Sequence, residues 1–210
     1  MEITKEHIKC WINKINEKIT ENKCYLTKLD QPIGDGDHGV NMERGFQATV
    51  NMLETTSYDT VSSMLKACAL SVMSKVGGAA GPLYGTAFLR MSLHLNGAQL
   101  VTEKMFIEAL EEAVVGMKKR GRTEVGEKTM IDVWAPVVEK LQKDGAFHAS
   151  AIIQTAKEAR NKTEHIAASK GRASFFKEKS VGYIDPGAAS SYIIFEALAE
   201  TLEEGACQRG

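Results

Sequence analysis

Apolar residues recur every three or four positions over most of this chain, which is the spacing of one face of an α-helix. In the first such stretch, Ile8, Ile12 and Ile15 follow this period. Alternation of apolar and polar residues, which would indicate a strand, never persists, so the sequence predicts an all-α fold. The predicted helices cover residues 8–19, 42–53, 61–76, 83–95, 102–117, 130–141, 149–169 and 185–202.

Several of these stretches begin with residues that favour a helix start. Thr4 and Thr102 stand at N-cap positions, and Asp185 is followed by Pro186, a common first-turn residue. The connections are short, and helices joined in this way usually pack antiparallel to their neighbours. We therefore expect one domain, residues 1–210, built as an eight-helix antiparallel up-and-down bundle.

In such a bundle, the loops after the first, third, fifth and seventh helices lie at the same end. These loops are residues 30–41, 76–82, 121–130 and 170–187, and they hold most of the unusual chemistry. The loops at the other end, residues 54–60, 96–102 and 143–148, are short or polar. The N-termini of four helices also point to the first end, with unpaired N–H groups and a partial positive charge. We expect a ligand site there.

The first of these loops is rich in carboxylates. Asp30, Asp35 and Asp37 lie within eight positions, and His38 and Asn41 follow at the start of a helix. Carboxylate oxygens suit Mg²⁺, Mn²⁺ or Ca²⁺. The glycines between them are also ordinary turn residues, so a simple turn stays an alternative. The spacing does not match the Ca²⁺-binding loop of an EF-hand.

The other loops at this end suit an anion. Gly77, Gly78 and Gly81 expose bare backbone, and Lys128 and Arg172 add positive charge. Together with a divalent ion, these features favour a polyphosphate ligand, and a nucleotide above others. The segment 121–129 is not a phosphate-binding P-loop, because Glu127 precedes the lysine and a helix stands where a strand is needed.

Composition narrows the class of protein. Hydrophobic residues make up 43% and charged residues 25% of the chain, as in globular proteins with a real core. A formal net charge of −1 gives no case for nucleic acid or anionic lipid as a partner. No segment reaches the ~20 apolar residues of a membrane span, and no signal peptide precedes the first helix. The cysteines lack Cys-x-x-Cys spacing and indicate reduced thiols, so we expect a cytoplasmic protein.

Several motifs of the chain occur together in one known family. They are LTxLD from Leu26, IGDGDHGVNMxRGF from Ile33, VGGA from Val76, GPLYGT from Gly81, GEKTMxDVWxPVVE from Gly126, KGRAS from Lys170 and DPGA from Asp185. In these motifs the chain resembles the nucleotide-binding L subunits of bacterial dihydroxyacetone kinases driven by the phosphoenolpyruvate phosphotransferase system. The resemblance spans most of the chain in order.

The resemblance implies an eight-helix barrel with ADP and magnesium bound in the loops at one end. It implies that Asp30, Asp35 and Asp37 hold a pair of Mg²⁺ ions. It also implies a set of residues that line the nucleotide: His38, Asn41, Gly78, Ala79, Ala80, Gly121, Met130, Arg172, Asp185 and Gly187.

The resemblance further implies how such a protein works. ADP stays bound as a fixed cofactor, and a phosphotransferase component, the M subunit, rephosphorylates it to ATP in place. The γ-phosphoryl then passes to dihydroxyacetone held by a separate K subunit. The alternative is a non-catalytic paralogue that binds nucleotide and regulates a transcription factor. A third hypothesis, the nucleotide domain of another kinase such as one for fatty acids, is disfavoured because we expect no attached substrate domain.

Three features depart from the family pattern. Ala80 stands where members often have a small hydroxyl side chain, which removes one hydrogen bond worth about 1 kcal/mol. Glu127 stands where aspartate is common, and the tail from Glu203 has no counterpart, so we expect it to fray. The aspartate set is intact and favours the kinase over the regulator.

Overall fold

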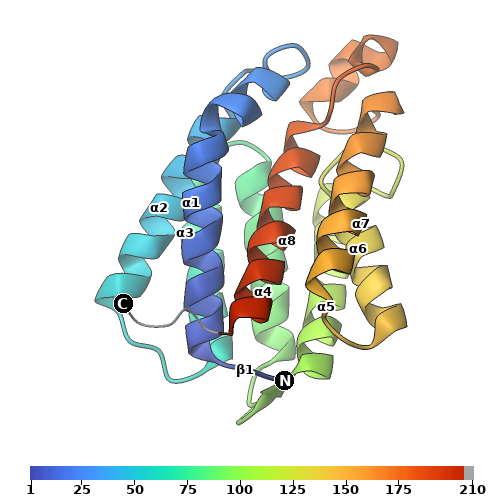
Figure 1. Ribbon diagram of the computed structural model, residues 1–210. Coiled ribbons are helices and arrows are strands. Elements are labelled where there is room, and N and C mark those ends of the chain that lie inside the picture. The colour runs from blue at the N-terminus through green and yellow to red at the C-terminus, as the bar shows by residue number, and fades with distance from the viewer. Residues whose placement is uncertain (206–210) are drawn as a thin grey trace.

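The computed structural model describes residues 1–205, and eight α-helices make up most of this part of the chain (Figure 1). They are α1 (Lys5–Asp30), α2 (His38–Thr55), α3 (Val61–Lys75), α4 (Ala80–His94), α5 (Glu103–Gly121), α6 (Ile131–Asp144), α7 (Ala149–Lys162) and α8 (Pro186–Glu204). Thr102 and Asp185 are N-caps whose side chains accept hydrogen bonds from Met105 N and Ala188 N. The predicted all-α class is confirmed.

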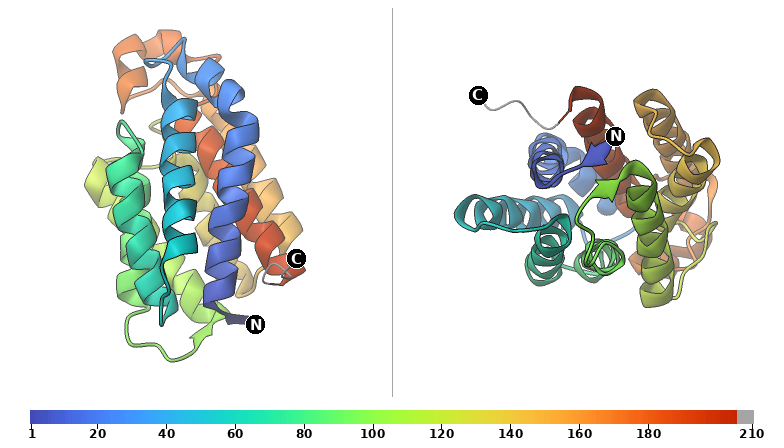
Figure 2. Two further views of the ribbon diagram at one scale, coloured as in Figure 1. Left: turned by 90° about the vertical axis from the view of Figure 1, so that its left-hand side faces the viewer. Right: turned by 90° about the horizontal axis from the view of Figure 1, so that it is seen from below.

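The helices form a closed ring. Each packs against the next one along the chain, and α8 packs against α1. The end-on view in Figure 2 shows the helices arranged around a common axis. Because the order around the ring follows the order in sequence, every second connection falls at the same end of the barrel.

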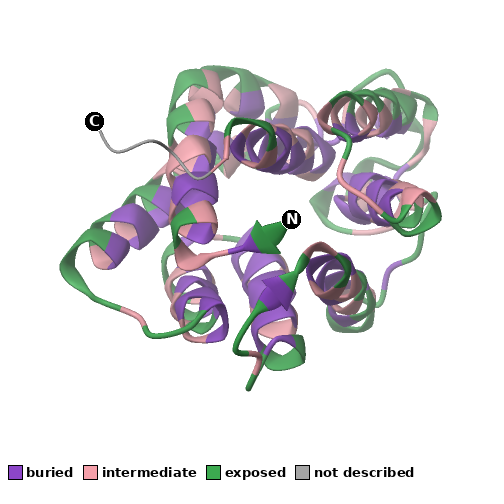
Figure 3. Cartoon of the chain, turned by 60° about the horizontal axis from the view of Figure 1, so that its bottom comes forward, coloured by how far each residue is buried: buried purple, intermediate pink, exposed green. Residues whose placement is uncertain are grey.

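Aromatic side chains fill the interior and join helices that are distant in the sequence. Trp11 of α1 is fully buried, donates from Nε1 to the carbonyl of Ile194 at 2.9 Å, and packs edge-on against Phe88 at 5.5 Å. Trp134 of α6 packs against Phe195 of α8, with ring centroids 4.8 Å apart. Figure 3 shows the buried positions gathered on the inward faces of the helices. This core fixes the helix ends from which the loops of interest project.

Two short strands correct the expectation that no strand occurs. β1 (Glu2–Ile3) pairs antiparallel with β2 (Val101–Thr102), so that Ile3 lies opposite Val101. Two residues are too few to show alternation in the sequence, which explains why the pattern missed them. The pair ties the N-terminus to the connection between α4 and α5 (Figure 1).

Two helix ends also differ from the expectation. α1 continues to Asp30, so this carboxylate lies on a helix rather than in the loop. The seventh helix ends at Lys162 instead of 169, because Thr163 donates to Arg160 O and accepts from Asp185 N. Two 3₁₀-helices follow, η1 (Thr163–His165) and η2 (Arg172–Ser180).

The cysteines are not all reduced thiols, as we had expected from their spacing. Cys24 and Cys68 are free, whereas Cys10 is disulfide-bonded. Sequence spacing tests for local metal or redox motifs, and it does not report which distant cysteines meet in space. In the expected frayed tail, Glu203 and Glu204 are helical, and residues 206–210 lie outside the described part. None of the described helices is both long and apolar enough to cross a membrane.

Candidate functional site

One cavity of about 360 Å³ lies at the barrel end where α1, α3, α5 and α7 finish. All four loops predicted to meet there contribute to its wall, together with the N-termini of α2, α4, α6 and α8. Every site residue predicted from the sequence lines it: Asp30, Asp35, Asp37, His38, Asn41, Gly78, Ala79, Ala80, Gly121, Met130, Arg172, Asp185 and Gly187. Their individual roles stay predictions. Their convergence from distant parts of the chain is a finding.

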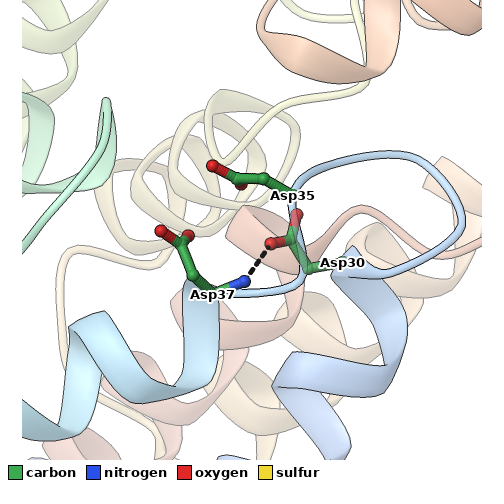
Figure 4. A group of neighbouring side chains, drawn as sticks. All are labelled: Asp30, Asp35 and Asp37. Carbon is green, nitrogen blue, oxygen red and sulfur yellow. Dashed lines mark hydrogen bonds between the residues drawn. The ribbon is translucent and has the colours of Figure 1, made fainter.

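The three aspartates form a compact acidic cluster (Figure 4). One carboxylate oxygen from each of Asp30, Asp35 and Asp37 lies within 4.8 Å of the others. Asp30 is only 8% exposed, and its Oδ2 accepts from Asp37 N at 2.9 Å and from His38 N at 3.2 Å. It therefore caps α2 from outside, since the side chain of the N-cap residue Asp37 makes no capping bond.

The backbone of Gly34 packs closely against Oδ1, the second carboxylate oxygen of Asp30. A Cβ atom on Gly34 would lie 1.9 Å from Asp30 Oδ1, so only glycine fits at this point of the loop. With Oδ2 engaged in capping and Oδ1 held against Gly34, the carboxylate of Asp30 has a set position at the base of the cluster. This is a preformed arrangement of hard oxygen donors.

The cluster already attracts a cation. Arg172, at the start of η2, lies with Nη2 2.8 Å from Asp35 Oδ2. The pKa of Asp35 is raised by partial burial and then by the carboxylate of Asp37, while Arg172 acts in the opposite direction. Because the carboxylates repel one another, a positive charge placed among them is stabilised. The residues present therefore fit a divalent ion such as Mg²⁺.

His38 is held by a chain of buried hydroxyl groups. Its Nε2 lies 2.9 Å from Ser190 Oγ, which lies 2.6 Å from the hydroxyl of Tyr84. Tyr84 in turn contacts Ser191 Oγ at 2.9 Å, and Trp134 Nε1 donates to the same Ser191 oxygen. Burial lowers the pKa of His38 to about 4. The imidazole is therefore neutral at pH 7. It interacts with its neighbours through hydrogen bonds and carries no positive charge.

Comparison with known proteins identifies the family. The family model described as "DAK2 domain" matches residues 32–200. The chain belongs to this family. It is 46% identical to the ADP-binding subunit DhaL of a PTS-dependent dihydroxyacetone kinase from Lactococcus lactis, over 91% of this chain and 95% of that protein. It is 36% identical to the corresponding subunit of the PEP-dependent enzyme of Escherichia coli, over 97% of this chain and 100% of that protein.

A solved structure shares the fold. The dihydroxyacetone kinase of C. freundii, in complex with AMP-PNP and Mg²⁺, matches 95% of this chain with a TM-score of 0.77 and 21% identity. The chain spans 34% of that longer protein. At this level of identity the match establishes the architecture of the DAK2 domain and leaves the residues of the site to be argued from their own geometry.

One cation that lines the cavity of this DAK2 domain is engaged by the protein's own backbone. Lys128 was expected to offer positive charge to a polyphosphate, yet its side chain is 1% exposed and its Nζ donates to the carbonyls of Thr163 and Tyr183. Burial lowers the pKa of this ammonium group. Lys128 thus ties the α5–α6 connection to the segment before α8. A sequence pattern shows that a charged residue is present, but not whether its ammonium group is already hydrogen-bonded to backbone carbonyls.

Asp185 and Asp132 shape the wall formed by the later loops. Asp185 Oδ2 accepts from Ala188 N at 2.7 Å, and burial raises the pKa of its carboxyl to about 7. Asp132 accepts from Gly126 N at 2.5 Å and from Thr129 N at 2.7 Å, which folds residues 121–130 back onto the start of α6. Asp132 lies in a motif of the DAK2 resemblance, but nothing in its spacing indicated this role.

Sequence reasoning missed several residues that line the cavity, notably Ile33, Leu83, Thr123 and Thr129. Leu83 lies one turn after Ala80 on α4, and its Cδ2 would lie 3.3 Å from a Cβ on Gly121. Helical spacing from Ala80 could have predicted Leu83, because residues three apart share a face. Ile33 and Leu83 give the DAK2 cavity an apolar wall that a planar base can cover.

Proposed function

We propose that this chain is the ADP-binding subunit of a phosphoenolpyruvate-dependent dihydroxyacetone kinase and that it acts as a single nucleotide-binding unit. The observation that carries the proposal is the meeting of the acidic cluster, the diglycine turn and four helix N-termini around one cavity. The near full-length similarity to two subunits of such kinases supports it. We expect the protein in the cytoplasm because of its similarity to these kinase subunits, since the disulfide at Cys10 removes the argument from reduced thiols.

In this proposal the acidic cluster holds Mg²⁺, as two ions, against the phosphates of ADP. ADP held in this cavity would supply the acceptor for a phosphoryl group and, as ATP, the donor of that group to dihydroxyacetone. Asp30, Asp35 and Asp37 would ligate the metal, and the N-termini of α2 and α4 would direct N–H groups at phosphate oxygens. Phosphoryl transfer depends mostly on positioning and charge neutralisation, which these groups supply.

The division of labour follows from what lines the cavity. Burial lowers the pKa of His38 to about 4, which makes it a weak base, and its Nε2 is engaged with Ser190, so it is not suited to act as a general base. Nothing else in the lining of the cavity combines a nucleophile with a base at bonding distance. We therefore propose that dihydroxyacetone is bound by a separate K subunit and that a phosphotransferase component, the M subunit, is the phosphoryl donor. A regulator that only docks to a partner would not need the ion cluster.

The experiment is to purify the protein, measure bound nucleotide after denaturation, and repeat the measurement after dialysis against EDTA. The proposal predicts bound ADP that EDTA removes and that EDTA presaturated with Mg²⁺ leaves in place. Alone, the protein should not phosphorylate dihydroxyacetone, and addition of a K subunit and a phosphotransferase donor should restore turnover. Failure to bind ADP in excess Mg²⁺ would contradict the proposal.

A further inference from the structure

Asn41 lies in the first turn of α2 and is almost completely buried at the edge of the cavity. The diglycine turn after α3 covers one side of it. A Cβ on Gly77 would lie 2.5 Å from Asn41 Oδ1 and 2.8 Å from Nδ2, so any residue but glycine would collide with the amide. The carboxamide therefore lies flat against the backbone of Gly77.

Arg44 holds the amide from another direction. Residues 41 and 44 are three apart on α2 and so share a face. Arg44 Nη2 donates to Asn41 Oδ1 at 2.8 Å, and Arg44 Nε donates to the carbonyl of Lys75, the last residue of α3, at 3.1 Å. One guanidinium thus joins the end of α3 to the amide of Asn41, and its two donors fix its own position.

This contact decides which way the amide points. A guanidinium has only donors, so the atom of Asn41 that meets Arg44 is the carbonyl oxygen. The NH₂ group is then turned away from Arg44. No residue in the described part of the chain accepts a hydrogen bond from Asn41 Nδ2. The structure therefore leaves one oriented donor group with no protein acceptor, on a residue that is only 7% exposed, at the wall of a cavity that is lined by helix N-termini.

We propose that Arg44 is a positioning residue that turns the NH₂ group of Asn41 toward the phosphates of the bound nucleotide. The inference rests on the proposed function, because it takes a nucleotide as the ligand. Arg44 does not itself line the cavity; it acts through Asn41. Without it, the carboxamide can rotate and present its oxygen, which repels a phosphate.

The test is a double-mutant cycle on the dissociation constant of ADP, measured by calorimetry in excess MgCl₂ with protein stripped of nucleotide. Arg44→Met and Asn41→Ala should each raise this constant about tenfold, as expected for a hydrogen bond to a charged group. The dissociation constant of the double variant should equal that of Asn41→Ala to within about twofold, because Arg44 then has no amide to position. Arg44→Lys keeps the charge but has a single donor nitrogen in place of the guanidinium fork, and its dissociation constant should lie between those of the wild type and Arg44→Met.

Lys75→Met is the matched control, because it removes one positive charge from the residue whose carbonyl Arg44 contacts and keeps that carbonyl. It should change the dissociation constant by less than about twofold. Equal losses from Arg44→Met in the wild-type and Asn41→Ala backgrounds would overturn the inference, as would no loss at all. Both outcomes leave the proposed function intact, whereas a wild type that does not bind ADP contradicts the function itself.

NMR of the Asn41 side chain provides a second test, which does not depend on the folding of every variant. The side-chain amide signals of Asn41, assigned by their loss in Asn41→Ala, should shift on addition of ADP to the wild type. In Arg44→Lys the shift should be smaller. If the side-chain amide signals of Asn41 in the wild type do not shift on addition of ADP, the inference is overturned.

Discussion

Arg172 and Asp35 form an ion pair, with Nη2 2.8 Å from Oδ2, that joins the α7–α8 connection to the α1–α2 loop across the mouth of the cavity. The guanidinium neutralises the carboxylate that we propose as a metal ligand. A divalent ion and Arg172 therefore compete for Asp35. Phosphate oxygens of a bound nucleotide would give Arg172 another partner.

Replacement of Arg172 by glutamine should have opposite effects on the two ligands. Affinity for Mg²⁺ without nucleotide should rise by up to about fivefold, because an exposed competing charge is removed. Affinity for ADP in excess Mg²⁺ should fall about tenfold, because a charge-assisted phosphate contact is lost. Calorimetry with each ligand measures both. Lys179→Gln, on the same segment but outside the cavity lining, is the control and should change neither.

Asp185 should make stability depend on pH in an unusual direction. Burial raises the pKa of its carboxyl from 3.8 to about 7; Asp132 and Asp30 add to the rise and Lys128 opposes it. Between these values the folded state binds a proton that the unfolded state has released, so this group's contribution to stability falls as pH rises. Asp185→Asn keeps an N-cap acceptor and removes the titration.

The measurement is urea unfolding of the nucleotide-free wild type and Asp185→Asn at several pH values from about 4 to about 8. The stability of the variant relative to the wild type should increase across this range. A difference that stays constant with pH would show that Asp185 does not titrate as its burial requires.

Tyr84 should contribute to stability through its hydroxyl group. The Tyr84 hydroxyl contacts Ser190 and Ser191 in the buried interior, and it also contacts the carbonyl of Gly187, which is partly buried, at 3.0 Å. Tyr84→Phe should lower the free energy of unfolding by about 1–3 kcal/mol, because it leaves buried partners unsatisfied. Tyr192→Phe removes a hydroxyl that contacts Glu196 in a partly exposed place and should cost less. Equal costs in denaturant unfolding would contradict the role assigned to the chain of hydroxyl groups.

Much of the fold could be read from the sequence because it is a local property. Helical periodicity and capping residues at Thr102 and Asp185 located the helices. Up-and-down order then placed the four loops at one end, since consecutive helices reverse direction. The two-residue strands and the end of α7 were missed, because they depend on contacts such as Thr163 with Asp185 that join distant segments.

The site could be predicted only as far as residue type and loop position determine it. The aspartates were found because clustered carboxylates are rare in a short turn. The sequence does not show that Lys128 donates to backbone carbonyls, because these carbonyls belong to segments far along the chain. It does not show the role of Arg44 either, because that role depends on the packing of the end of α3 against α2. The sequence thus predicts which residues could bind a metal or a phosphate better than it predicts which residues hold them in position.

The most direct test of the central claim is the rate of phosphoryl transfer to dihydroxyacetone in a reconstituted system with a K subunit and a phosphotransferase donor. Asp35→Asn keeps the size of the side chain and removes one charge from the acidic cluster. Asp59→Asn, an exposed aspartate in the loop between α2 and α3 at the other end of the barrel, is the matched control. We predict that Asp35→Asn lowers the rate by about 100-fold and Asp59→Asn leaves it unchanged. A rate for Asp35→Asn equal to that of the wild type would contradict the assignment of this cavity as the metal–nucleotide site.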